Sequence, residues 1–124
     1  MKFSHQITRS KRKNRKKFSK SSSCERRRKM VSPLSKDLKI KYNVSSVPIR
    51  KEDEVQIIRG SFKGKRGKIV QCHRKNFHIF IDKIINAKTS KNSSYVPISP
   101  SNVIVTGINL NHDRKIFFSK KMSL

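Results

Sequence analysis

Apolar residues in the middle of the chain recur with the period of two that is typical of β-strands. Val55, Ile57 and Arg59 alternate with Gln56 and Ile58, and the segment with Phe77, Ile79 and Ile81 is apolar on both faces. The expected strands cover residues 55–59, 68–72, 77–82, 95–98 and 103–106. Five short strands separated by turn residues are typical of a small barrel.

Composition separates this segment from the rest of the chain. Leu, Ile, Val and Phe account for 20 of the 62 residues at 47–108, of which 17 are Ile or Val and none is Leu. Such β-branched residues favour strands. At 1–46 the same four types number 8 of 46, too few for a highly charged chain to close a core. We therefore expect an extension (1–46), a β domain (47–108) and a tail (109–124).

The extension is expected to contain only short helices and coil. Residues 9–20 form a solvated charge run without an apolar face. Ser22 and Glu25 have the spacing of a capping box, which predicts a helix to about Met30. Pro33 suits the start of a second helix and Asn43 its C-cap. Helices this short need a partner to be stable. The tail has Ile116-Phe117-Phe118 as a candidate anchor but no clear expected structure.

The charge balance points to a polyanionic partner. The 124 residues include 32 Lys+Arg and 7 Asp+Glu, a formal net charge of +25. The apolar runs are too short for a membrane span, and the charged first 20 residues do not resemble a secretory signal. We therefore expect no membrane contact and no small-molecule substrate.

The two cysteines indicate neither a metal site nor a disulfide framework. Without an export signal, Cys24 and Cys72 are expected to be free thiols, although a single disulfide remains open. Cys72, His73 and His78 offer three poorly spaced ligands where structural zinc needs four. We expect no metal and no cofactor.

A basic loop punctuated by glycine, at residues 59–68, carries the most specific signal. Gly60, Gly64 and Gly67 permit positive φ and close backbone approach. Between them, Phe62 is suited to stack on an unpaired base, and the cations are suited to phosphates. The alternative is a flexible hairpin whose charges serve solubility.

This strand–loop–strand segment resembles the KOW motif, which is found in SH3-like barrels of ribosomal and transcription-elongation proteins. The wider chain resembles the eukaryotic and archaeal family of one large-subunit ribosomal protein, universal number twenty-four (eukaryotic number twenty-six). The resemblance covers nearly the whole chain and rests on SPLSKDL at 32–38, KYNV at 41–44, VPIRKEDEVQ at 47–56, YVPISPS at 95–101 and DRK at 113–115.

The resemblance implies an all-β fold, a small five-stranded SH3-like barrel with a long basic N-terminal extension. It implies a structural protein without enzymatic activity that binds and orders large-subunit ribosomal RNA. Such a protein joins the subunit early and lies beside the peptide tunnel exit, in contact with neighbouring ribosomal proteins. The expected location is the cytoplasmic ribosome, with nuclear and nucleolar passage during assembly, and residues 11–17 have the composition of a nuclear localisation signal.

The expected RNA-contacting residues lie in the extension, in an Arg cluster, in a short arm and in the glycine loop. They are Arg9, Lys11, Arg12, Lys13, Arg15, Lys16, Lys17, Arg26, Arg27, Arg28, Lys29, Arg50, Lys51, Arg59, Phe62, Lys63, Lys65, Arg66 and Lys68. Within this set, Arg26–Arg28 are favoured for specific contacts, because Arg stacks on bases and grips phosphate through two hydrogen bonds.

Three other function classes fit less well. A KOW elongation factor usually has an additional α/β domain, which residues 1–46 are too polar to form. A histone-like DNA compactor would have Lys/Ala/Pro-rich tails, whereas this chain has a β-rich centre and an Arg cluster. A small nuclease needs an acid–base pair in a pocket, and the four histidines, including His5 and His112, are scattered along the chain.

Phe77 and Phe80 are expected in the barrel core rather than as base-stacking platforms.

Overall fold

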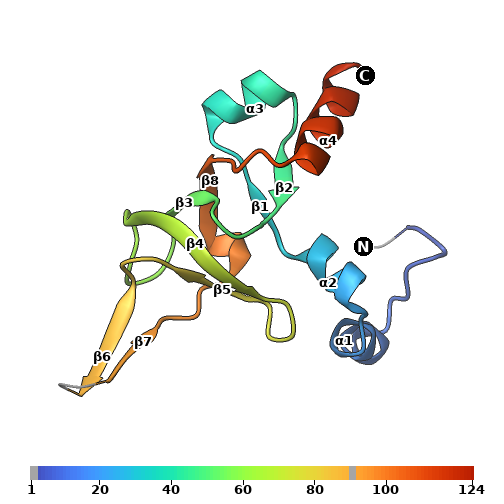
Figure 1. The fold of residues 1–124 in the computed structure, drawn as a ribbon. Helices are drawn as coiled ribbons and strands as arrows, with labels where there is room; N and C mark the ends of the chain where they lie inside the picture. Colours follow the sequence, from blue (N-terminus) through green and yellow to red (C-terminus); the bar gives the residue numbers. More distant parts are fainter. Residues whose placement is uncertain (1–2, 90–91) are drawn as a thin grey trace.

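Antiparallel strands form the centre of the structure, and helices flank them at both ends of the chain (Figure 1). The computed structural model describes residues 3–89 and 92–124. The largest sheet has the strand order β5-β4-β3-β8, with every neighbouring pair antiparallel. Its strands are β3 (Glu54–Ile57), β4 (Arg66–His73), β5 (His78–Ile81) and β8 (Val103–Gly107). Four of the five expected strands are thus confirmed with shifted ends.

Two smaller sheets complete the β structure of the described residues. β1 (Val31–Pro33) pairs with β2 (Ser46–Pro48), and β6 (Ile85–Thr89) pairs with β7 (Asn92–Tyr95) in a hairpin that projects from the rest (Figure 1). The fifth expected strand, at 95–98, is largely wrong. β7 ends at its first residue, and Ile98 makes only an isolated bridge to Ile79.

Among the described residues, these sheets do not close into a barrel. The antiparallel β centre and short helices near the N-terminus are confirmed, but the chain is mixed rather than all-β, because a further helix forms the C-terminal tail. α1 (Lys11–Ser19) occupies the charge run at 9–20, where no regular structure is expected from the sequence. Lys and Arg are good helix formers, and Ser10 caps this helix by accepting a hydrogen bond from the Lys13 N–H (3.5 Å).

The other two N-terminal helices follow the sequence signals in part. α2 (Ser23–Lys29) has the expected capping box between Ser22 and Glu25. α3 (Lys36–Tyr42) ends at Asn43 in the left-handed conformation (φ 51°), as expected. Its expected start at Pro33 is wrong, because Pro33 lies in β1 opposite Ser46.

The core consists mainly of Ile and Val from alternate strand positions. β3 buries Val55 and Ile57, β5 buries Ile79 and Ile81, and β8 buries Val103 and Val105, each no more than 2% exposed. Each such side chain contributes about 1.5–3 kcal/mol. Three buried residues from outside 47–108 join the same cluster, namely Met30, Leu34 and Phe118.

The two phenylalanines expected in the core differ in their surroundings. Phe77 is partly buried against the core, and its ring stacks on Phe18 of α1 with centroids 4.2 Å apart. Phe80 alternates with the buried Ile79 and Ile81, so it lies on the opposite face of β5. The core placement of Phe80 is therefore wrong.

The tail contains a helix that the sequence pattern does not reveal. α4 (His112–Met122) packs beside α3 (Figure 1), where buried Phe118 stacks on Tyr42 with centroids 4.4 Å apart. Only Arg114 and Phe118 of this helix are buried. A burial of two residues one turn apart leaves too narrow an apolar stripe to detect by periodicity.

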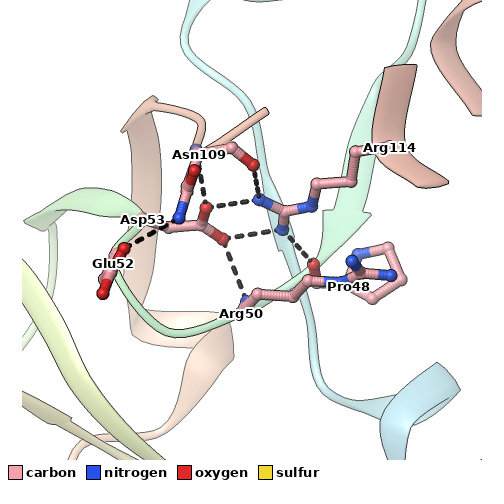
Figure 2. Close-up of polar contacts among 6 residues, drawn as sticks. All are labelled: Pro48, Arg50, Glu52, Asp53, Asn109 and Arg114. Carbon is pink, nitrogen blue, oxygen red and sulfur yellow. Dashed lines mark hydrogen bonds and ion pairs between the residues drawn. The ribbon is translucent and has the colours of Figure 1, made fainter. Parts of the chain in front are cut away.

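A buried ion pair attaches α4 to the sheet (Figure 2). Asp53 is fully buried, Arg114 is 5% exposed, and the two side chains form two hydrogen bonds, one of 2.7 Å between Arg114 Nη2 and Asp53 Oδ2. The Arg50 and Asn109 N–H groups donate to Asp53 at 2.9 and 3.1 Å. Arg114 also donates to the carbonyls of Pro48 (2.8 Å) and Asn109 (3.1 Å). The Asp53–Arg114 pair thus joins the end of β2, the residue before β3 and α4.

The replacement Arg114→Met is expected to lower the free energy of unfolding by about 3–5 kcal/mol, because it leaves the Asp53 charge buried and unpaired. Urea unfolding of the full chain, followed by circular dichroism, measures this change. Lys115→Met removes one exposed cation from the same helix and is expected to change stability by less than about 0.5 kcal/mol. Equal stabilities of the two variants would contradict the role of the pair.

Candidate nucleic-acid interface

The cations of α1 have no carboxylate partners. This helix buries no residue and has no acidic residue in its first turn. Its exposed cations, with Arg9 before it, are Lys11, Arg12, Lys13, Arg15, Lys16 and Lys17. In the described part of the chain, ion pairs form only between Lys68 and Glu54 (3.8 Å) and between Arg114 and Asp53. The α1 cations are therefore available to an external anion.

Arg26 differs from its neighbours in the Arg cluster, because its guanidinium is used inside the protein. It donates to the carbonyls of Ser21 (3.0 Å), Lys75 (3.0 Å) and Ser19 (2.7 Å). Its guanidinium carbon also lies 5.5 Å from the centroid of the Phe77 ring. Arg26 thus holds the α1–α2 junction against the turn between β4 and β5.

The next two arginines are exposed and lie near the predicted arm. Arg27 and Arg28 line one pocket together with Arg50. Burial, followed by the charges of Arg27 and Arg114, lowers the pKa of the Arg50 guanidinium. Cations brought this close without enough carboxylates favour an anion between them. Lys51 is exposed beside Arg50, and Lys29 lies with its Nζ 4.7 Å from the Phe18 ring centroid.

The glycine loop between β3 and β4 is a hydrogen-bonded turn. Gly60 (φ 96°) and Gly64 (φ 88°) adopt the left-handed region, and the Gly64 N–H donates to the Ile57 carbonyl at 2.8 Å. At Gly67, an added Cβ would lie 2.7 Å from the carbonyl oxygen of Asp82. All three glycines thus serve backbone geometry, and the cations between them gain a fixed support.

The side chains of the loop divide into one packed ring and several exposed cations. Phe62 packs in part against the core, and the Lys65 Nζ lies 5.1 Å from its ring centroid. A base stacking on this ring would have to share it with the Lys65 ammonium. The exposed cations of this region are Arg59, Lys63, Lys65, Arg66 and Lys68.

The matches to known proteins cover nearly the whole chain. The family of ribosomal proteins known as L26 in eukaryotes, with its archaeal L24 counterparts, matches residues 8–121. The chain belongs to this family. It is 46% identical over 121 residues to the large ribosomal subunit protein uL24 of Dictyostelium discoideum, covering 98% of this chain and 87% of that protein. It is 43% identical over 122 residues to uL24 of Littorina littorea, covering 98% and 85%.

This is a family of ribosomal proteins, which are structural, and membership favours the ribosomal interpretation over the elongation factor, the DNA compactor and the nuclease. Within the described residues, no three His, Cys, Asp or Glu side chains are grouped as a metal site would require. Of the helices described, none has the length and apolar character needed to cross a bilayer.

Sequence reasoning missed the residues that position this interface. Asp53 and Arg114 lie within segments quoted for the family resemblance, but nothing local reveals that they pair across 61 positions. Arg114 and Phe118, one turn apart, are the buried residues of α4, and a pair of one cation and one ring gives no periodic signal of a helix. Phe18 and Phe77, which hold α1 in place, are 59 positions apart and show no shared pattern.

Both cysteines are free, but their surroundings differ. Cys24 is exposed on α2, whereas Cys72 is partly buried in β4. Burial, together with the negative charge of Asp53, raises the pKa of the Cys72 thiol. The thiolate of Cys72 therefore forms only at a higher pH than that of an ordinary cysteine.

Alkylation by iodoacetamide is expected to show this difference. In a Cys24→Ser variant, the rate of Cys72 modification is expected to be low near neutral pH and to rise through a midpoint above that of the same variant unfolded in urea. Mass spectrometry of the labelled chain over a pH series measures both midpoints. A folded-state midpoint at or below the unfolded one would contradict the raised pKa of the Cys72 thiol.

Proposed function

We propose that this member of the ribosomal L26 family binds and orders RNA of the large ribosomal subunit, of which its family makes it a structural constituent. The observation that carries the proposal is the formal net charge of +25 on a chain whose α1 and α2 bury no residue. The two relatives are named as large ribosomal subunit proteins, which favours ribosomal RNA among polyanions.

The mechanism is charge neutralisation by an ordered scaffold. Folded RNA brings phosphates close together, and cations placed between its helices relieve their repulsion and release bound counterions. α1 and α2 lie to one side of the central sheet (Figure 1), so their cations are presented outward while the β core fixes their register. Because both helices are too short to be stable alone, RNA would strengthen their order as it binds.

The finer fold and site assignments belong to the same proposal. We infer that β3, the glycine turn and β4 form a KOW element in an SH3-like module, an interpretation that the antiparallel β3–β4 pairing and the left-handed Gly60 and Gly64 support. In this interpretation, the loop cations Lys63, Lys65 and Arg66 contact phosphates. The division of the chain into 1–46, 47–108 and 109–124 stays a prediction.

The family resemblance extends the proposal to the protein's place in the ribosome. It implies binding near the 5′ part of the long RNA, early entry into the subunit, and a position beside the peptide tunnel exit among neighbouring ribosomal proteins. It also implies passage through the nucleus and nucleolus before the ribosome functions in the cytoplasm, for which residues 11–17 have a suitable basic composition.

Salt dependence tests whether α1 contacts phosphates. Affinity falls as salt rises, so the slope of log affinity against log salt is negative. Replacing Lys13, Lys16 and Lys17 together by Gln is expected to reduce the magnitude of this slope by roughly 2–3, since each phosphate contact contributes about 0.7–0.9. Filter binding of the full chain to transcribed large-subunit RNA over a salt series measures the slope.

A triple variant with the same charge change serves as the control. Lys115, Lys120 and Lys121 are exposed on α4, and their replacement by Gln is expected to reduce the magnitude of the slope by less than about 1. Equal losses in the two variants would show that overall charge, rather than α1, determines binding. Slopes unchanged from the original chain in both variants would remove α1 from the interface.

A further inference from the structure

A pocket between α2, the end of β2 and α4 combines cations with an aromatic wall. Its volume is about 320 Å³, within the range of pockets that hold small organic ligands. Its lining includes the cationic residues Arg27, Arg28 and Arg50, the aromatic residue Phe117, and the apolar residues Val47 and Pro48. No residue of α1 or of the glycine loop is among the residues that line this pocket.

The pocket carries an excess of positive charge. Arg114 also lines it, but Asp53 neutralises this guanidinium from the protein side. The carboxylate in the lining is Asp113, against three arginines that no salt bridge in the described residues compensates. The nearby charges of Arg27 and Arg114 add to burial in lowering the pKa of Arg50, which indicates that these cations repel one another. An anionic group in the pocket would relieve this repulsion.

The aromatic wall is held in place by the core. Phe117 is 39% exposed, and its ring meets that of Phe118 at 70° with centroids 5.4 Å apart. Phe118 is buried and stacks in turn on Tyr42 of α3. A fixed, partly exposed ring beside arginines has the two elements that recognise an unpaired nucleotide, a stacking surface for the base and cations for the phosphate.

We propose, on the basis of the RNA-binding function above, that this pocket holds one unpaired nucleotide of the bound RNA, with its base against Phe117 and its phosphate on Arg27, Arg28 and Arg50. A free phosphate would need only the arginines and would leave Phe117 and the apolar wall unused. A nucleotide uses both. The pocket thereby adds recognition of an extruded base to the phosphate contacts of α1 and the loop.

Two single-stranded probes separate the base from the phosphate, namely a short oligoadenylate and an abasic strand with the same number of phosphates. The full chain is expected to bind the oligoadenylate more tightly. Phe117→Leu is expected to lower this preference by about fivefold or more, the effect of losing one base–aromatic stack, while affinity for the abasic strand stays the same. Arg28→Gln is expected to weaken binding of both strands equally.

Two further variants guard against misfolding and against general stacking. Phe117→Tyr keeps the ring and is expected to keep the preference. Tyr95→Leu removes a ring that is 43% exposed on β7, outside the pocket, and is expected to leave the preference unchanged. A loss in Tyr95→Leu as large as in Phe117→Leu would overturn the proposal in favour of stacking on any exposed ring.

The remaining outcomes separate this proposal from the function on which it rests. If the chain binds both strands and Phe117→Leu leaves the preference for bases unchanged, the pocket is not a nucleotide site, although RNA binding stands. Inorganic phosphate serves as a competitor. If it displaces the oligoadenylate equally well from the original chain and from Phe117→Leu, and both bind the oligoadenylate equally, the pocket binds phosphate alone and the proposal is overturned. If the chain binds neither strand nor large-subunit RNA, the proposed function fails, and the pocket proposal fails with it.

Discussion

The buried contact between Asp53 and Arg114 is the constraint on which the arrangement of this protein depends. It is the point where the end of β2, the start of β3 and the C-terminal helix meet, and every oxygen of the carboxylate is satisfied there. The chain has a formal net charge of +25 and few carboxylates. A buried cation needs a paired anion, so Asp53 is what allows Arg114 to lie in the interior. By fixing Arg114, it also fixes Phe117 and Phe118 one turn further along α4.

The rest of the molecule separates apolar packing from charge. Ile and Val on all four strands of the central sheet, together with Met30, Leu34 and Phe118, make a small neutral core. The cations lie outside it on helices that contribute little burial of their own, held by side contacts such as Phe18 on Phe77 and by the hydrogen bonds of Arg26. A neutral core that supports a cationic surface is suited to the RNA-binding role proposed above, in which phosphates would supply the missing negative charge.

The sequence predicted the features that depend on local pattern. The period of two located the strands of the central sheet, the Ser22–Glu25 spacing located α2, and Asn43 marked the end of α3. It failed where pairing between distant residues decides structure. α4 is held by contacts to Asp53 and Tyr42, so its own sequence shows almost no apolar face. α1 buries no residue and is held through the stacking of Phe18 on the distant Phe77. At the interface, the cations were evident from composition, but the internal role of Arg26 and the pocket at Phe117 required the fold.

The most direct test of the central claim is lysine acetylation, measured residue by residue by mass spectrometry, on the free protein and on large subunits purified through a high-salt sucrose gradient. The account predicts that the protein sediments with the large subunit and that lysines of α1 and of the glycine loop, such as Lys13 and Lys63, lose reactivity there. Release of the protein by high salt, or lysines of α1 and the loop that stay as reactive in the subunit as in the free protein, would contradict it.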